Sequence, residues 1–374
     1  MQLLLLLRHA SACFPYVLAW EAVQLFPGPW TSRRARSPFG RLEGSTCPPG
    51  GMIRSIPEFQ SKKVHIQDPD RVEHLICSLI KGGASKLQVV SDFDMTLSRF
   101  SFNGKRCSTC HNVIDKCKLF TEEAKKELSD LKDKYYPIEM DPKLSNEDKF
   151  PFMVEWWTKA HGVMSQLDIR KDKLAVIVQE SDAMLRDGCD VFLNALHAHN
   201  VPLIVLSAGL GDILEEIIGQ ANLFLPNIHI IANYMDFDEK GRIKGFKGEM
   251  IHTYNKRDGA LRNSPYFHLL RNNSNVILLG DTMGDLSMAD GIPNVQNVLK
   301  IGFLNDKMDG LLETFLAAYD IVLVQDETLD LVNAILQKCC LAYMHRLNKG
   351  IRHKNMFHAW NKIAHTMLNW IEIW

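Results

Sequence analysis

The sequence has almost no net charge, no long apolar run and no regular array of cysteines. Its 43 basic and 44 acidic residues nearly cancel, so we expect no nucleic acid polymer as a partner. The apolar stretches Met1–Leu7 and Phe14–Trp20 are far shorter than the roughly 20 residues of a membrane span. We expect no membrane association, with an N-terminal targeting segment as the weaker alternative.

The nine cysteines are unevenly spaced, and most stand singly inside apolar runs. This pattern is typical of reduced intracellular cysteines. We therefore expect a cytoplasmic protein, and we expect it to be a monomer.

The 374 residues, of which 46% are hydrophobic, suffice for a core domain with a smaller partner domain. Residues 1–57 are predicted to form a disordered leader, because residues 27–55 are rich in Pro, Gly, Ser and Arg without periodicity. Residues 338–374 form a basic, aromatic tail. The tail is either an appended segment or an amphipathic docking helix, and we assign it no function.

The hydrophobic pattern between these ends predicts an α/β fold. A helix beginning near Asp68 leads into a strand at Leu87–Val90. Residues 99–200 are dominated by amphipathic helical segments, such as Glu122–Tyr135, Asp148–Gln166 and Lys171–Arg186. Strands and helices then alternate, which predicts a doubly wound, Rossmann-like parallel sheet with a helical cap inserted after the first core strand. The expected core comprises 58–98 and 201–337, the cap is 99–200, and the later strands are Val201–Leu206, Ile228–Ala232, Asn275–Leu279, Val298–Phe303 and Ile321–Val324.

Two carboxylates follow the first core strand in the stretch Val89–Leu97. Asp92 and Asp94 are two positions apart, and burying both costs several kcal/mol for each ionised group unless a cation or a shared proton compensates. A hard divalent metal is the simplest compensation.

Later strand ends carry further candidate ligands. Ser207 precedes two glycines and a helix, which suits an anion, although a tight turn explains the same residues. Asp281 and Asp285 follow another strand and, with Asp92 and the backbone carbonyl of Asp94, supply oxygen ligands for Mg²⁺. Ca²⁺ fits the same chemistry, and a helix cap is the alternative for Asp285.

The order of these motifs resembles the haloacid dehalogenase superfamily of phosphohydrolases. Asp-x-Asp-x-Thr is followed by a helical insert, Ser207, Lys256 and Gly-Asp-x-x-Gly-Asp. The longer wording is similar to the cytosolic 5′-nucleotidase III (pyrimidine 5′-nucleotidase) family, in a match from about Glu58 to Gln337. The segments that carry it are Ser91–Phe100, Tyr135–Glu139, Met153–Lys159 and Gly245–Gly248.

This resemblance implies an Mg²⁺-dependent hydrolase of nucleoside 5′-monophosphates, with phosphotransfer as a side activity. Asp92 would be the nucleophile that forms an aspartyl-phosphate, and Asp94 would protonate the leaving ribose oxygen and later activate water. Phosphoryl oxygens would be held by Ser207, the Ala208 amide and Lys256. Without this resemblance, Lys256 would be interpreted as an ordinary surface lysine.

The base preference stays open between CMP or UMP and 7-methyl-GMP. Glu139 matches the family carboxylate that reads the base. Trp157 and Ala160 match the branch that prefers 7-methylguanylate, whereas His111 matches the pyrimidine branch. A tryptophan face suits a cationic base through cation–π attraction of about 1 kcal/mol, although cap packing explains Trp157 equally well.

Two competing interpretations come from other classes of protein. Cys107–His111 has the spacing of a c-type haem attachment site and, with Cys117, of part of a zinc site, but a local cysteine pair is the simpler interpretation. The second interpretation is a catalytically silent nucleotide-binding or scaffolding protein. The presence of Asp92, Asp94, Lys256 and Asp281 argues against that alternative.

Overall fold

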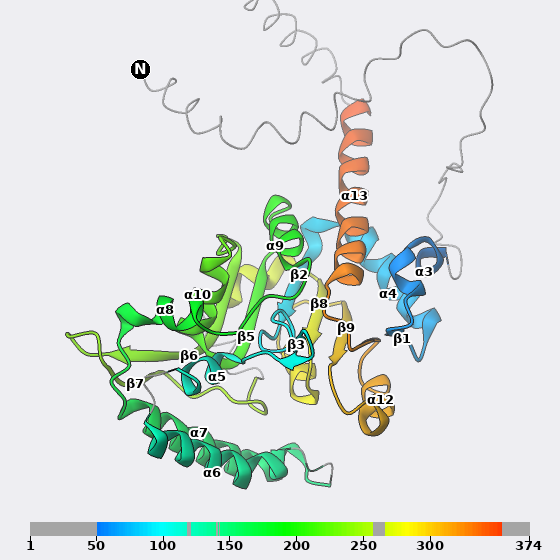
Figure 1. Cartoon of the computed structure of the whole chain (residues 1–374). Helices are drawn as coiled ribbons and strands as arrows, with labels where there is room; N and C mark the ends of the chain where they lie inside the picture. Colours follow the sequence, from blue (N-terminus) through cyan, green and yellow to red (C-terminus); the bar gives the residue numbers. More distant parts are fainter. Residues whose placement is uncertain (1–50, 118–120, 140, 142, 257–265, 354–374) are drawn as a thin grey trace, which may run out of the picture. The chain divides into compact units, whose positions relative to one another are not determined.

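The centre of the protein is an eight-stranded sheet in the order β1-β10-β9-β8-β2-β5-β6-β7 (Figure 1). The computed structural model describes residues 51–353 except 118–120, 140, 142 and 257–265. All neighbouring strands are parallel except at the two edges, where β1 and β7 are antiparallel. The strands are β1 Val64–His65, β2 Leu87–Ser91, β5 Leu203–Leu210, β6 Ile228–Phe237, β7 Ile243–Lys247, β8 Asn275–Gly280, β9 Asn297–Leu304 and β10 Ile321–Val324.

The chain changes direction across the sheet at β2. From β2 it proceeds to β5 and β6 on one side, and it then returns to β8 on the other side of β2. Ser91 on β2 pairs with Leu279 on β8, and the next amide, that of Asp92, donates to the Leu279 carbonyl at 2.9 Å. Open α/β sheets bind ligands at such a switch point, beyond the carboxyl ends of the strands.

Helices bury both faces of the sheet. Alternate residues of β2 point to opposite faces, so Val89 and Val90 belong to separate hydrophobic clusters. The cluster with Val89 includes helices α4 Pro69–Gly82, α9 Cys189–Ala198, α10 Gly211–Gln220 and α13 Asp330–His353. The cluster with Val90 includes α12 Met308–Leu316 and the 3₁₀ helices η5 Phe267–Asn272 and η6 Met283–Ser287.

Three short helices complete the described part of the core. They are α3 Gly51–Ser55, η2 Pro57–Gln60 and η3 Ala84–Lys86. The predicted helix from Asp68 is α4, in which Asp68 accepts from the Arg71 amide at 2.9 Å and caps the first turn. The parallel strand order and the helices on both faces confirm the predicted doubly wound sheet.

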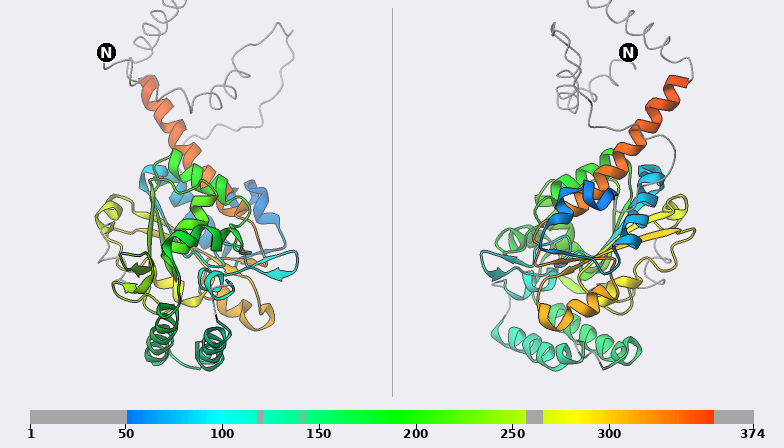
Figure 2. Two further views of the ribbon diagram at one scale, coloured as in Figure 1. Left: turned by 60° about the vertical axis from the view of Figure 1, so that its left-hand side comes forward. Right: turned by 90° about the vertical axis from the view of Figure 1, so that its right-hand side faces the viewer.

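The insert after β2 is mainly helical, as predicted. Helices α6 and α7 pack against each other, and Figure 2 shows this pair as a separate layer below the sheet. Helix α8 packs on α10, and α9 packs on α13. The elements are the hairpin β3 Ser101–Phe102 and β4 Lys105–Arg106, then α5 Cys110–Asp115, α6 Glu122–Glu139, α7 Asn146–Ser165, η4 Lys171–Lys173 and α8 Leu174–Gln179.

One local prediction was wrong, and one strand was not predicted. The amphipathic pattern over 171–186 predicts one helix, but α8 ends at Gln179. The following residues instead pair with the segment after β2, where the Arg186 amide donates to the Leu97 carbonyl at 2.8 Å. Strand β7 was also missed, because its side chains lack a regular alternation and it forms an edge paired with β6.

Both predicted terminal segments lie largely outside the described residues, and the predicted limits of core and cap stay predictions. Helix α13 continues past Gln337, and Cys339 and Cys340 are buried in the hydrophobic core. A shortened chain should therefore retain these residues. Within the ranges that the structure describes, no helix is both long enough and apolar enough to span a bilayer.

Candidate active site

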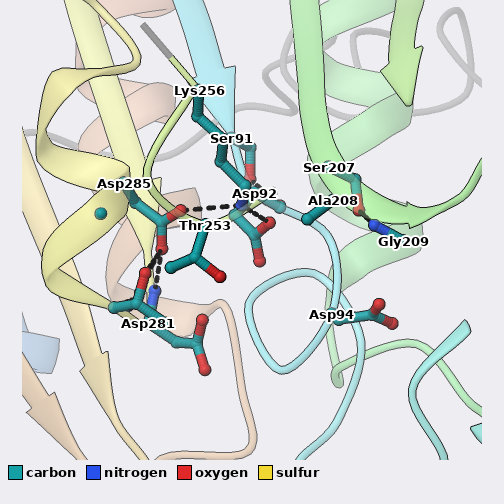
Figure 3. Close-up of polar contacts among 12 residues, drawn as sticks. Ser91, Asp92, Asp94, Ser207, Ala208, Gly209, Thr253, Lys256, Asp281 and Asp285 are labelled. Carbon is teal, nitrogen blue, oxygen red and sulfur yellow. Dashed lines mark hydrogen bonds and ion pairs between the residues drawn. The ribbon is translucent and has the colours of Figure 1, made fainter. Parts of the chain in front are cut away.

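Asp92 lies directly after β2 and is buried, with 4% of its surface exposed. The Lys256 ammonium contacts its Oδ1 atom, and the same ammonium donates to Asp285 Oδ1 at 2.8 Å (Figure 3). Burial raises the pKa of Asp92 to about 7, against the lowering effect of Lys256 and with a further increase from Asp285. The structure therefore brings predicted residues from three distant segments together.

Asp92, Asp281 and Asp285 form a compact acidic group. One carboxylate oxygen from each lies within 4.8 Å of the others. The pKa of Asp281 is raised well above its usual range by burial and by the charges of Asp92 and Asp285. A divalent cation relieves this repulsion, and an all-oxygen donor set is the one that Mg²⁺ prefers. The predicted ligands Asp92 and Asp281 thus fit a metal, with Asp285 beside them.

Asp285 has two roles in this geometry. Its Oδ2 atom accepts from the amides of Asp281 at 3.1 Å and Thr282 at 2.9 Å, which forms a capping box at the start of η6. Its Oδ1 atom holds Lys256. Gly280 permits this packing, because a Cβ atom there would lie 2.5 Å from the Asp285 Cβ. Asp285 thus takes part in the helix cap, with Thr282 as the N-cap residue, and its supporting role at a metal stays a prediction.

Asp94 occupies separate surroundings. Its carboxylate points away from the acidic group (Figure 3), and its Oδ2 atom lies close to Gly209. Its Oδ1 atom accepts from the Cys110 amide at 2.8 Å, and burial raises its pKa. A Cβ atom at Gly209 would lie 2.7 Å from Asp94 Oδ2, so only glycine permits this approach. The predicted metal contact of Asp94 concerns its backbone carbonyl and stays a prediction.

Ser207 and Ala208 lie on β5, which pairs with β2 on the side opposite β8. Ser207 is 1% exposed, and its hydroxyl accepts from the Gly209 amide at 2.9 Å. Helix α10 begins two residues later. A polar turn at a helix start thus faces the same end of β2 as the acidic group, as the sequence predicted.

Glu139 reaches the core from the end of α6. Its Oε1 atom accepts from the Thr253 hydroxyl at 2.8 Å, and its backbone carbonyl accepts from the Tyr254 hydroxyl at 2.8 Å and the Lys149 ammonium at 2.9 Å. Burial raises the pKa of Glu139. The insert therefore contacts the loop that carries Lys256. Thr253, Tyr254 and Lys149 could not be identified as members of the site from the sequence.

His111 and Trp157 belong to an aromatic cluster with His161 and Phe246. The rings of His111 and Trp157 are 4.7 Å apart and edge-on, and His161 stacks on Phe246 at 3.7 Å. Burial lowers the pKa of His111 to about 3 and that of His161 to about 4, so both rings are neutral at pH 7. Their Nε2 atoms and the Trp157 Nε1 are buried without a hydrogen-bond partner in the described part of the chain.

One further member of this cluster could have been predicted from the sequence. His161 follows Trp157 by four residues on α7, which places both on one helix face. Phe246 comes from β7, and its approach to His161 depends on tertiary structure alone.

The cysteine-based interpretations gain no support. Cys107 and Cys110 are free, buried thiols. Over the residues that the structure describes, the acidic group is the one cluster of potential metal ligands.

The comparisons with known proteins agree with this geometry. Residues 95–340 match the family model described as pyrimidine 5′-nucleotidase (UMPH-1). The 7-methylguanosine phosphate-specific 5′-nucleotidase of Homo sapiens is 54% identical over 286 residues, which are 76% of this chain and 95% of that protein. The putative cytosolic 5′-nucleotidase 3 of Caenorhabditis elegans is 37% identical, over 74% of this chain and 75% of that protein.

A solved structure shares the fold. The crystal structure of cytosolic 5′-nucleotidase IIIB bound to cytidine has a TM-score of 0.71 and 32% sequence identity, and the match covers 79% of this chain and 98% of that one. The haloacid dehalogenase fold predicted from the motifs is thus confirmed.

Proposed function

Because the chain belongs to the pyrimidine 5′-nucleotidase family and is a 5′-nucleotidase, we propose that it forms an aspartyl-phosphate on Asp92 with Mg²⁺ as cofactor. The observation that carries this proposal is the position of Asp92. Its carboxylate lies at the topological switch point, in contact with Lys256 and grouped with Asp281 and Asp285.

Each element around Asp92 has a part in phosphate binding. Ser207, the Ala208 amide and Lys256 hold the phosphoryl oxygens, since positioning and charge stabilisation are most of what phosphoryl transfer requires. Asp92, Asp281 and the Asp94 carbonyl would hold Mg²⁺, with Asp285 in support. When bound, the ion supplies positive charge that stabilises the phosphoryl oxygens.

The reaction then divides between two carboxylates. Asp92 attacks phosphorus and forms a P–O bond, while the bond to the ribose 5′-oxygen breaks and that oxygen takes a proton from Asp94. A water molecule next gives its proton to Asp94 and attacks the phosphorus, which releases phosphate and restores Asp92. The raised pKa of Asp94 supports its role as the proton carrier, because burial favours the protonated form that a general acid needs.

The aromatic cluster and Glu139 form the proposed base site, and we propose 7-methylguanine as the preferred base. Its positive charge suits the face of Trp157 beside two neutral imidazoles, and the Glu139 carboxylate can accept hydrogen bonds from the N–H groups of guanine. The relatives named for 7-methylguanosine phosphate support this choice. Pyrimidines are the second candidate, because the similar solved structure is bound to cytidine.

Phosphate release from a panel of CMP, UMP, GMP and 7-methyl-GMP, with and without Mg²⁺, tests the proposal. We expect turnover only with the metal, the highest kcat/KM for 7-methyl-GMP, and no turnover by Asp92→Asn. Asp190→Asn, at an exposed position on α9, is the matched control and should retain activity. Equal activity of wild type and Asp92→Asn would contradict the proposed nucleophile.

A second pair of variants tests the base site. Trp157→Leu should lower kcat/KM for 7-methyl-GMP by about tenfold relative to CMP, because a desolvated cation–π contact contributes about 1–2 kcal/mol. Trp156→Leu is the control, since this neighbouring ring stacks on Tyr135 instead. A parallel loss for both nucleotides would mean that Trp157 only packs the cap.

Three further proposals concern the oligomeric state, the cellular compartment and a side activity. We propose a monomer in the cytoplasm, and the name of the C. elegans relative supports that compartment. Transfer of the phosphoryl group to another nucleoside, in place of water, is the proposed side activity.

A further inference from the structure

Arg186 carries a positive charge in the interior of the protein, with its side chain 0% exposed. Its Nε donates to the Thr96 carbonyl at 2.8 Å, its Nη1 to the Asp326 carbonyl, and its Nη2 to the Met95 carbonyl and to Asn305 Oδ1 at 3.1 Å. A buried cation without partners costs several kcal/mol. Here all three guanidinium nitrogens have acceptors. Although burial lowers its pKa to about 10, Arg186 stays charged at neutral pH.

Two of the three carbonyls that Arg186 binds, those of Met95 and Thr96, belong to the turn that begins at Asp94. Met95 has a φ of 63°, a left-handed conformation that is strained for a non-glycine residue. Its carbonyl accepts from both Arg186 and Asn305 Nδ2, the latter at 3.0 Å, and its amide donates to the Ser98 hydroxyl at 2.9 Å. Such a conformation persists only where the surroundings fix it, so these contacts determine the direction in which the chain leaves Asp94.

Arg186 also lies where the insert rejoins the core. The outgoing and returning segments pair, since the Arg99 amide donates to the Met184 carbonyl at 2.9 Å and the Arg186 amide to the Leu97 carbonyl at 2.8 Å. The segments that leave the core (97–99) and return to it (184–186) are therefore joined, and the Arg186 guanidinium links them to the turn after Asp94.

We propose that Arg186 is a positioning residue that holds the Met95–Thr96 backbone so that the Asp94 carboxyl stays between the Cys110 amide and Gly209, aligned with the leaving oxygen. The inference rests on the proposed function, in which Asp94 is the proton donor. Asn305 completes the arrangement, because it binds both the guanidinium and the Met95 carbonyl. Neither residue needs to touch the substrate.

The proton requirement of the leaving group separates this role from a merely structural one. A ribose 5′-oxygen leaves poorly without a proton, whereas a thiolate leaves readily, because a thiol has a pKa of about 8.5 against about 15.7 for water. We therefore compare a nucleoside 5′-monophosphate with its analogue in which sulfur bridges C5′ and phosphorus. Both carry the same base and sugar.

The variants are Arg186→Lys, which retains the charge but not the planar donor set, and Asn305→Ser, which leaves Arg186 in place. We compare kcat/KM, which covers phosphoryl transfer to Asp92 and is independent of the later hydrolysis that also uses Asp94. For the oxygen ester we expect kcat/KM to fall by about ten- to a hundredfold, since general acid catalysis contributes about 10²–10⁴, and for the sulfur-bridged substrate we expect a fall of less than about threefold. Asp94→Asn should show the same selective loss in kcat/KM.

Arg242→Lys is the control, because this arginine pairs with Asp168 at an exposed position. Melting temperatures identify variants that do not fold, and Asn305→Ser remains informative if Arg186→Lys is one of these. An equal loss on both substrates, or no loss on either, would overturn the inference. A wild type that releases no phosphate from the oxygen ester would instead refute the proposed function.

Discussion

His161 illustrates how burial fixes the charge of a single residue in this protein. It is 8% exposed and stacks on Phe246 within the aromatic cluster. Burial lowers its pKa from an ordinary value of about 6.5 to about 4. The unfolded chain therefore binds a proton between these values that the folded chain excludes. Stability should fall as the pH decreases through this range.

His161→Phe should make this dependence shallower. The phenyl ring preserves the stack on Phe246 and removes one group that titrates between about pH 6.5 and about pH 4. The measurement is the urea midpoint of unfolding from neutral pH to about pH 5. His111 remains in the variant, so a reduced slope is expected and not a flat profile. The exposed His74, changed to Phe, should leave the wild-type slope intact, and an unchanged slope in His161→Phe would contradict the assignment.

Helix α6 and the loop from His252 to Lys256 interact through two hydroxyl groups, those of Thr253 and Tyr254, that the sequence did not single out. Tyr254 donates to the Glu139 carbonyl at the end of α6, and Lys149 on α7 donates to the same atom. Lys256 lies two residues beyond Tyr254. The insert is thus connected by hydrogen bonds to the loop that carries Lys256, the proposed phosphate-binding lysine.

Tyr254→Phe should raise KM for nucleotides by about two- to tenfold, because it removes one hydrogen bond worth about 0.5–1.5 kcal/mol. Ribose 5-phosphate lacks a base for the insert to bind, so its kcat/KM should change less. Steady-state kinetics on both substrates provide the measurement. Tyr266→Phe makes the same change in a ring that stacks on His229 and should have no effect. Equal losses on both substrates would mean that the contact does not serve base binding.

Elements were predictable from the sequence where local pattern and tertiary environment agree. The apolar runs at β2, β8 and β10 are buried strands, and Asp68 caps α4. The prediction of one helix over 171–186 failed, because backbone pairing with Leu97–Arg99 outweighs the amphipathic pattern. Phe246 and Arg186 could not be predicted as site neighbours, since their partners are distant in the sequence and no local spacing indicates them.

At the scale of the whole molecule, the order of the strands accounts for the composition of the site. Asp92 follows β2, Ser207 lies on β5 and Asp281 follows β8, and these three strands are neighbours although the sequence separates them widely. The motif order therefore sufficed to predict that these residues lie at the same end of neighbouring strands. It did not indicate that Asp94 would point away from the acidic group and approach Gly209.

Grouped carboxylates also predict how the folded protein responds to metal. At the proposed site, bound Mg²⁺ would relieve repulsion among Asp92, Asp281 and Asp285, so the melting temperature should rise with its concentration. Saturation at about 100 times the dissociation constant contributes about 2.7 kcal/mol. Asp281→Asn should lose most of this response, whereas Asp190→Asn should retain it. A melting temperature independent of Mg²⁺ in the wild type would exclude the proposed site.

The most direct test of the central claim is to trap the phosphoenzyme. Wild type and Asp94→Asn are mixed with substrate and Mg²⁺, quenched in acid within a single turnover, and digested for mass spectrometry. The account predicts one phosphoryl group on Asp92, no such group in Asp92→Asn, and slower loss of the group in Asp94→Asn because water activation is impaired. A phosphoryl group on another residue, or turnover that persists in Asp92→Asn, would contradict it.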